Sequence, residues 1–239
     1  MKMFMKKIYC YLIFCFLTAL FISCEHESEG VYTDDTTEAI QLYDYYVDEY
    51  GNEGIVVYSM ESSSTYYVVL SSDESFQPWG PMGEQIYAVD SVRKTNLSVA
   101  SYGVAMHQTM KSRGINRFPA QAWCDSKNHE EEHPRAGSWR LPTHREWTLI
   151  LGSGGANVNK INTALSNIGG IPLDEDRKYW CCDEDYEGHI KINNVTSGYD
   201  SQNRAVITSP LRTTFSTKER WLKKNKYYVR AIKYIYYED

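Results

Sequence analysis

Residues 138–151 read SWRLPTHREWTLIL, and this stretch carries the clearest structural signal in the chain. Thr143 followed three residues later by Glu146 is a capping-box pattern, which marks the start of a helix. Pro142, directly before it, disfavours helical backbone at the preceding residue. We therefore expect an extended piece that turns at Thr143 into a helix running to the end of the stretch.

The two tryptophans of this stretch lie on either side of the turn. Trp139, Arg140 and Leu141 read as the short extended piece, and Trp147 lies in the first turns of the helix. Large aromatic side chains bury much apolar area, so Trp139 and Trp147 are expected in the core.

Upstream, the sequence predicts a hairpin and two helices. The runs GIVVYS (54–59) and TYYVVLSS (65–72) are β-branched and aromatic and are bounded by turn residues, as in paired strands. Apolar residues spaced by three and four predict a helix over 99–111, and Pro119 is a favoured first-turn residue for another. A further short helix is expected near 39–46.

Downstream, one helix and then several strands are predicted. The Gly-rich LGSGGAN (151–157) ends the first helix, and another should cover 157–168. Strands at both ends with helices between them indicate the α+β class. The strand-like runs are KYWCC (178–182), HIKINNV (189–195), RAVITS (204–209) and KYYVRAIKYIYY (226–237).

The first residues, MKMFMKKIYCYLIFCFLTALFISC, are typical of a bacterial lipoprotein signal peptide. Lysines precede an apolar run from Ile8 to Ile22, which is short for a membrane span. The run ends in FISC, which resembles the lipobox, where a lipidated cysteine becomes the first mature residue. We expect removal of residues 1–23, fatty acyl chains such as palmitate on Cys24, an acidic tether over 24–53 and one domain over 54–239.

Several acyl chains on one cysteine would hold the protein firmly on a membrane. The EHESEG that follows Cys24 resembles signals that send some lipoproteins to the outer face of the outer membrane. We therefore expect a lipid-anchored protein of the bacterial outer membrane at the cell surface. The alternative is that EHESEG is a solvated tether without a sorting signal. The net charge is −6, and the scattered basic residues give no nucleic-acid surface.

Apart from the lipidated Cys24, the mature chain keeps three cysteines, and export permits a disulfide. Three thiols allow one bridge, so we expect Cys124 to pair with either Cys181 or Cys182. The alternative is three buried thiols that act as small hydrophobic side chains.

The segment HEEEHP (129–134) matches the zinc pattern H-E-x-x-H. On a helix, His129 and His133 would be zinc ligands and Glu130 a general base. The flanking residues are polar, however, and Pro134 stops a helix directly after the second histidine. We expect a solvated loop, with His129 and His133 only weak metal candidates, and we expect no cofactor.

Several of these pieces together resemble the Lcl C-terminal domain family, which is similar to the formylglycine-generating-enzyme and C-type-lectin-like folds. The most specific are W-R-L-P-T-x-x-E-W (139–147), Y-W (179–180) and V-R-A-I (229–232). The resemblance implies such a mixed domain over 54–239, with its terminal strands paired and Y-W paired with the closing strand. The signature residues are Trp139, Leu141, Pro142, Thr143, Glu146, Trp147, Trp180 and Arg230.

The chain also departs from these relatives. The paired active-site cysteines of the formylglycine-generating enzymes have no clear counterpart, and Gln77-Pro78-Trp79 is only a near miss to the calcium-type sugar motifs of C-type lectins. We therefore expect no calcium-dependent sugar binding.

These features predict a non-catalytic binding protein of the cell envelope, an adhesin or a fimbrial-tip-like subunit. Its ligand would be a glycan, a host protein or a fimbrial subunit, contacted through loops at 77–85, 128–137 and 183–188. One alternative is an accessory structural part of an envelope assembly. The other is an enzyme, either a metal hydrolase using HEEEH or an oxidoreductase-like relative of the formylglycine-generating enzymes.

Overall fold

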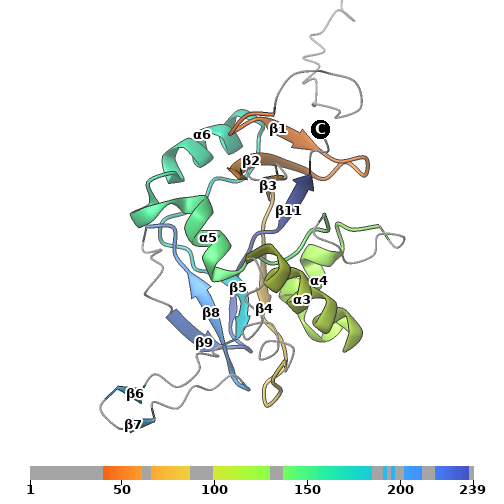
Figure 1. The fold of residues 1–239 in the computed structure, drawn as a ribbon, viewed down its shortest axis with the longest axis vertical. Helices are drawn as coiled ribbons and strands as arrows, with labels where there is room; N and C mark the ends of the chain where they lie inside the picture. The colour runs from red at the N-terminus through yellow and green to blue at the C-terminus, as the bar shows by residue number, and fades with distance from the viewer. Residues whose placement is uncertain are drawn as a thin grey trace, which may run out of the picture. The chain divides into compact units, whose positions relative to one another are not determined.

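The computed structural model shows a mixed α+β fold with two main sheets and helices packed against them (Figure 1). This confirms the predicted class. The structure describes residues 40–60, 66–86, 99–129, 137–184, 191–192, 195–196, 202–211 and 219–236. Among these residues, no helix is long and apolar enough to cross a bilayer.

The first sheet has the order β1-β2-β3-β11 and contains the first and last strands that the structure describes. β2 and β3 form the predicted antiparallel hairpin, with a bulge between Val56 and Tyr58. The terminal strands therefore share one sheet, but the closing strand β11 pairs directly with β3 rather than with β1. The strands are β1 (Tyr45–Val47), β2 (Glu53–Met60), β3 (Tyr66–Ser71) and β11 (Ile232–Tyr236).

Strand β1 corrects the predicted N-terminal boundary of the domain. Tyr45 to Val47 pair with Glu53 to Ile55, and Ile40 packs against the buried core. Residues 40–53 therefore belong to the domain and not to a tether, and the short helix expected near 39–46 is wrong. The run Tyr45-Tyr46-Val47 is aromatic and β-branched, which favours a strand next to an existing sheet edge.

The second sheet has the order β4-β10-β5-β8-β9. β10 runs parallel to β5, with Tyr228 opposite Tyr179, which confirms that Y-W pairs with the closing segment. β4 and β9 were not predicted; β4 ends at Pro78, which an edge strand tolerates. A small separate ladder joins β6 and β7. The strands are β4 (Ser75–Pro78), β5 (Tyr179–Glu184), β6 (Lys191–Ile192), β7 (Val195–Thr196), β8 (Arg204–Thr208), β9 (Glu219–Leu222) and β10 (Lys226–Val229).

The helices begin and end within a residue or two of the predicted positions. α3 packs against β5 and α4 against β4, whereas α5 packs against β5 and β8, and α6 against β2. The helices are α3 (Val99–Ser112), α4 (Pro119–Asp125), α5 (His144–Leu151) and α6 (Val158–Asn167), with short 3-10 turns η1 (Ile115–Arg117) and η2 (Ser153–Gly155).

Strands buried on both faces divide the core into two clusters. Along β5, Trp180 and Cys182 join the cluster with α3 and α4, whereas Tyr179 and Cys181 join the cluster with α5 and α6. Successive strand side chains point to opposite faces, so both sets are buried at once. The near-continuous apolar character of YWCC follows from this position.

The closing segment changes sheets at Arg230 and Ala231. The sequence indicated one long strand here, but β10 ends before these residues and β11 begins after them. The Arg230 guanidinium is fully buried and donates to the carbonyls of Ser71 and Ser72 at 3.0 Å each. It also donates to the Ile171 carbonyl at 2.7 Å and the Glu74 carboxylate at 3.1 Å. One side chain thus joins the closing segment to two others, residues 71–74 and the chain at Ile171, where the two sheets meet.

The SWRLPT turn forms as predicted and is anchored to the closing strand. Thr143 and Glu146 make both hydrogen bonds of the capping box. Glu146 also accepts from the buried Arg140 at 2.5 and 2.9 Å and from the Tyr234 hydroxyl at 2.7 Å. Burial, together with the Glu146 charge, raises the pKa of Tyr234, so its hydroxyl keeps the proton that it donates. Trp139 and Trp147 are fully buried, as expected.

Replacement of Gly103 by alanine tests this packing. In most helices this change stabilises the protein, and here we expect it to destabilise the protein. A Cβ atom at Gly103 would collide with the guanidinium of Arg140. In an open helix Gly→Ala stabilises by about 1 kcal/mol. We expect Gly103→Ala instead to lower the free energy of unfolding in urea by about 1–3 kcal/mol, because the buried guanidinium must move. A gain in stability would show that Arg140 is not held there.

Cys124, Cys181 and Cys182 are all buried thiols, so the expected disulfide is not formed in the structure. Cys181 and Cys182 point to opposite faces of β5, and each fills a small apolar position in its cluster. Burial raises the pKa of the Cys124 and Cys182 thiols well above the ordinary value, which makes them poor nucleophiles.

Differential alkylation with mass spectrometry checks the state of these cysteines. We expect all three to resist iodoacetamide in the folded protein and all three to be alkylated in denaturant without reductant. A disulfide would leave two of them unmodified in denaturant until reductant is added.

Candidate binding groove

An open groove of about 490 Å³ lies between the chain entering β1 and helix α6, which run beside each other (Figure 1). One wall comes from the start of the domain and the other from the length of α6 and the residue after it. The lining residues are Tyr43, Asp44, Tyr45, Lys160, Thr163, Ala164, Asn167 and Ile168.

Tyr43 is held in an unusual backbone conformation. Its φ of 78° is the one positive value at a non-glycine residue among those described. Its N–H donates to the Val56 carbonyl at 2.6 Å, the Val56 N–H donates to the Asp44 carbonyl at 2.9 Å, and the Asp44 carboxylate accepts from the Gln41 N–H at 2.7 Å. A left-handed tyrosine is strained and persists only where its surroundings enforce it, which is a frequent property of binding sites.

The wall from α6 is the solvent-facing side of an amphipathic helix. Val158, Ile161 and Leu165 are buried in the core. Lys160, Thr163 and Asn167 are exposed, and spacings of three and four place them on one face.

The groove combines aromatic rings with available polar groups. Among the described residues, nothing pairs with the Tyr43 hydroxyl, the Lys160 amine or the Asn167 side-chain amide. The Tyr45 hydroxyl donates to Glu53 at 2.9 Å; burial and the Glu53 carboxylate raise its pKa to about 12, so it stays protonated. Such a lining suits a polar ligand with an apolar face.

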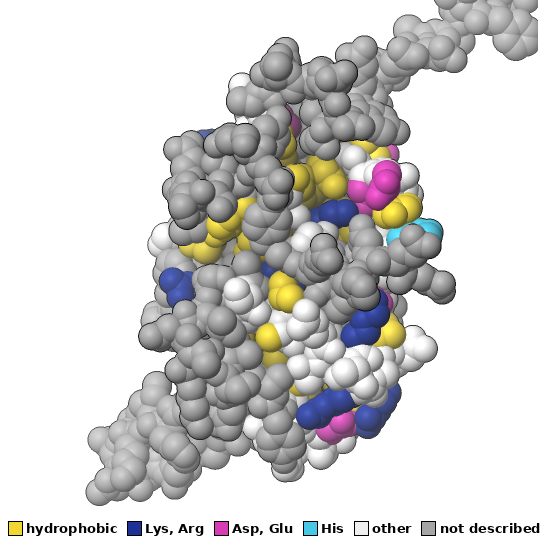
Figure 2. All heavy atoms as spheres, turned by 45° about the vertical axis from the view of Figure 1, so that its right-hand side comes forward, with side chains coloured by type: hydrophobic (Ala, Val, Ile, Leu, Met, Phe, Trp, Pro, Cys, Tyr) yellow, Lys and Arg dark blue, Asp and Glu magenta, His cyan; other side chains and the backbone are white. Residues whose placement is uncertain are grey.

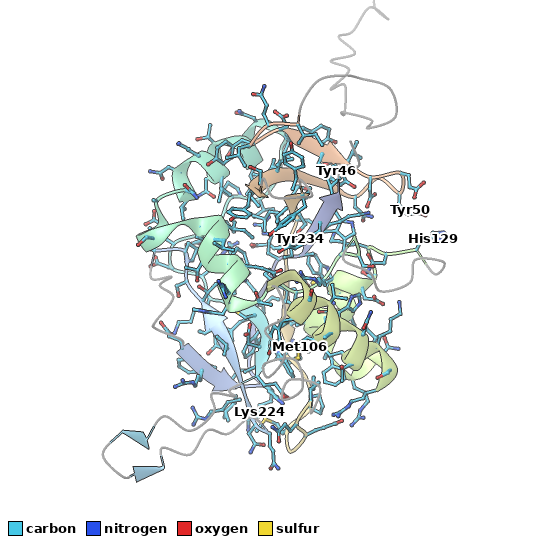
Figure 3. The ribbon with its side chains drawn as sticks, viewed as in Figure 1. Tyr46, Tyr50, Met106, His129, Lys224 and Tyr234 are labelled. Carbon is cyan, nitrogen blue, oxygen red and sulfur yellow. The ribbon has the colours of Figure 1, made fainter. Side chains whose placement is uncertain are left out.

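The HEEEHP segment is only partly described. His129 is exposed and stacks on Tyr50, with ring centroids 4.7 Å apart and an angle of 11° between the ring planes (Figure 3). His133 lies outside the described residues. In the ranges that are described, no cluster of three His, Cys, Asp or Glu side chains is arranged to hold a metal ion. In the view of Figure 2, histidine atoms lie at one edge of the molecule, beside hydrophobic and acidic side chains.

Asp48 fixes the turn that presents Tyr50. Its carboxylate accepts from the N–H groups of Tyr50 at 3.1 Å and Asn52 at 2.8 Å and from the Trp139 indole at 2.8 Å. Burial alone would raise the pKa of Asp48, but the hydrogen bonds from Trp139 and Asn52 outweigh it and lower the pKa below its ordinary value.

Asp48→Asn tests this anchor. Because the folded-state pKa is lowered, the stabilisation is complete above the ordinary value of 3.8 and fades as the pH falls through the folded-state pKa. We expect Asp48→Asn to lower the free energy of unfolding by about 1–2 kcal/mol at neutral pH and the difference from wild type to shrink in acid. Urea denaturation of both proteins from neutral pH to about pH 3 measures this difference.

Glu49→Gln, an exposed carboxylate in the same turn, is the control. If the difference in free energy of unfolding between Asp48→Asn and wild type stayed the same in acid, the stabilising role of the ionised Asp48 would be contradicted.

The described parts of the other predicted contact loops, 77–85 and the start of 183–188, are pinned rather than open; residues 130–136 and 185–188 lie outside the described residues. In 77–85, the Gly83 N–H donates to the Asn203 side chain, and Glu84 pairs with Arg113 and Arg117. Asp183 is buried and accepts from the His144 N–H at 2.7 Å, so the start of the 183–188 loop is part of the core.

Several titratable groups are buried in internal pairs. Lys223 pairs with Glu184 at 2.5 Å and lies over the Trp79 ring, and the burial of Glu184 raises its pKa. His107 is buried with Nε2 2.6 Å from Asp125. Each pair joins two different segments of the fold, which is a structural role.

The fold is thus an α+β domain with an aromatic groove at one sheet edge, and a solved structure is similar to it in fold. That structure is a fimbrial protein from Bacteroides ovatus ATCC 8483, with a TM-score of 0.56 and 14% identity over 81% of this chain and 48% of that chain. The chain therefore spans about half the length of this neighbour, and the likeness shows the fold. No protein-family model and no curated protein matches the chain, so the resemblance to the Lcl family stays a prediction.

Sequence reasoning missed the groove. Tyr43 and Tyr45 were assigned to the tether, and the polar face of α6 looks like any solvated helix face. The available signal was the aromatic and β-branched run at 45–47, which predicts a strand rather than a tether.

Proposed function

We propose that this chain is a non-catalytic, lipid-anchored binding protein of the bacterial cell envelope, of the adhesin or fimbrial-tip kind. The observation that carries the proposal is the likeness in fold to a fimbrial protein over most of the chain. The ligand would be a glycan, a host protein or another fimbrial subunit.

The distribution of polar groups supports binding rather than bond-making chemistry. Arg140 with Glu146, Lys223 with Glu184, and His107 with Asp125 serve to join elements of the fold. The polar groups of α6 that line the groove, Lys160, Thr163 and Asn167, are exposed instead, where they can meet a ligand.

The anchor and the location are part of the same proposal. The lipobox-like FISC and the acidic residues after it support lipidation of Cys24 and a place at the cell surface. Membership of the Lcl C-terminal domain family would agree with this. An accessory role in an envelope assembly is the second candidate, because the structural neighbour is itself a fimbrial protein.

Binding of the full chain to an array of glycans and extracellular-matrix proteins tests the function. The protein is solubilised in a detergent without a sugar headgroup, and EDTA is added to a parallel sample. We expect a saturable signal that EDTA leaves unchanged. A blank on the whole array would contradict a soluble-ligand adhesin, whereas loss of the signal in EDTA would favour a metal-dependent site.

Substitution of Cys24 tests the anchor. In cells fed with radiolabelled palmitate, we expect the wild-type protein to be labelled and to fractionate with membranes, and Cys24→Ser to lose the label. Cys15→Ser, within the apolar run, is the matched control and should keep it. Labelling that survives in Cys24→Ser would refute the assignment of the lipidated residue.

A further inference from the structure

We propose that the groove between β1 and α6 binds a pyranose segment of a glycan, with the tyrosine rings of Tyr43 and Tyr45 against the sugar and Lys160 and Asn167 bonded to its hydroxyls. This inference rests on the proposed function and names the ligand class of its site.

A sugar ring has an apolar C–H face and a polar rim of hydroxyls, and the groove offers partners for both. The two tyrosines stand on one wall, and burial with the Glu53 contact keeps Tyr45 protonated, with a pKa of about 12. Aromatic rings with a polar tip bind ligands that are apolar on one side and hydrated on the other. The wall from the tyrosines therefore fits the ring face.

The opposite wall fits the rim. Lys160 and Asn167 are exposed and without partners among the described residues, and both line the groove. The Thr163 hydroxyl between them donates to the Asn159 carbonyl at 2.9 Å, so its lone pairs remain to accept a bond. From Lys160 to Asn167 the helix advances about 10 Å, which gives hydroxyl partners along more than one sugar ring.

The groove is also fixed before a ligand arrives. Tyr43 is locked at φ 78° by the bonds to Val56, and α6 is held by its buried apolar face. A site that needs no ordering on binding loses less free energy to entropy, which matters for a small polar ligand.

An extended peptide is the competing occupant, because β1 lies at an edge of its sheet. A peptide added to β1 would bond to the strand backbone and would depend little on side chains of α6. Substitutions on α6 therefore separate the two occupants.

The experiment is saturation-transfer NMR on the full chain, in a detergent without a sugar headgroup, with lactose, chitobiose, mannobiose, sialyllactose and an extended peptide library as probes. We expect at least one saccharide to bind saturably. Lys160→Ala and Asn167→Ala should each raise its Kd roughly threefold to tenfold. Tyr43→Phe, which keeps the ring, should have a smaller effect than either.

Matched controls are available for both substitutions. Asn159→Ala changes an exposed asparagine of the same helix that does not line the groove. Lys224→Ala changes an exposed lysine that Figure 3 places at the other end of the domain from Tyr46 of β1. Both should leave the Kd unchanged, and circular dichroism confirms that every variant is folded.

Three results would overturn the inference. One is saccharide binding that the α6 variants do not weaken, and the second is binding of peptides alone. The third is no binding of any saccharide. In each case a signal on the wider array would still support the proposed function, whereas a blank there would reject both.

Discussion

The buried guanidinium of Arg230 is the interaction on which the arrangement of the two sheets depends. The closing segment serves both sheets, as β10 in one and β11 in the other, and Arg230 stands at the crossover. A chain that leaves one sheet for another exposes carbonyls that neither sheet pairs. Arg230 donates to the carbonyls of Ser71 and Ser72, where the chain leaves β3 for β4, and to the Ile171 carbonyl beside them. An arginine suits this position because its planar group offers several donors in fixed directions and stays charged.

The first sheet connects this crossover to the groove. β11 pairs with β3, β3 with β2, and β2 with β1, which begins at Tyr45 and follows Tyr43. α6 packs against β2, so both walls of the groove rest on the same sheet. The turn at Asp48 is tied in turn to Trp139 of the SWRLPT segment. The groove is therefore held by long-range contacts rather than by local sequence.

Local signals explain what the sequence could predict. The capping box at Thr143 and Glu146, the helix at Pro119 and the hairpin of β2 and β3 depend on residues near one another in the chain. β1 was missed although it pairs with the nearby β2 and its own residues favour a strand. The switch of sheets at Arg230 and the edge strand β4 depend on distant partners and were missed for that reason. The candidate site failed for the same reason, since Tyr43 and Asn167 meet only in the folded domain. The short HEEEH pattern, by contrast, lacked the apolar flanks that a zinc helix needs.

The most direct test of this account compares Arg230→Lys with Arg177→Lys, because both arginines pair with the same Glu74 carboxylate. Arg230 is fully buried and bonds three carbonyls, whereas Arg177 is partly exposed and lies over the Tyr228 ring. In urea denaturation we expect Arg230→Lys to lower the free energy of unfolding by about 2–4 kcal/mol, because a lysine leaves buried carbonyls without donors. Arg177→Lys should change it by about 1 kcal/mol or less. Equal small effects would contradict the claim that Arg230 holds the sheets together.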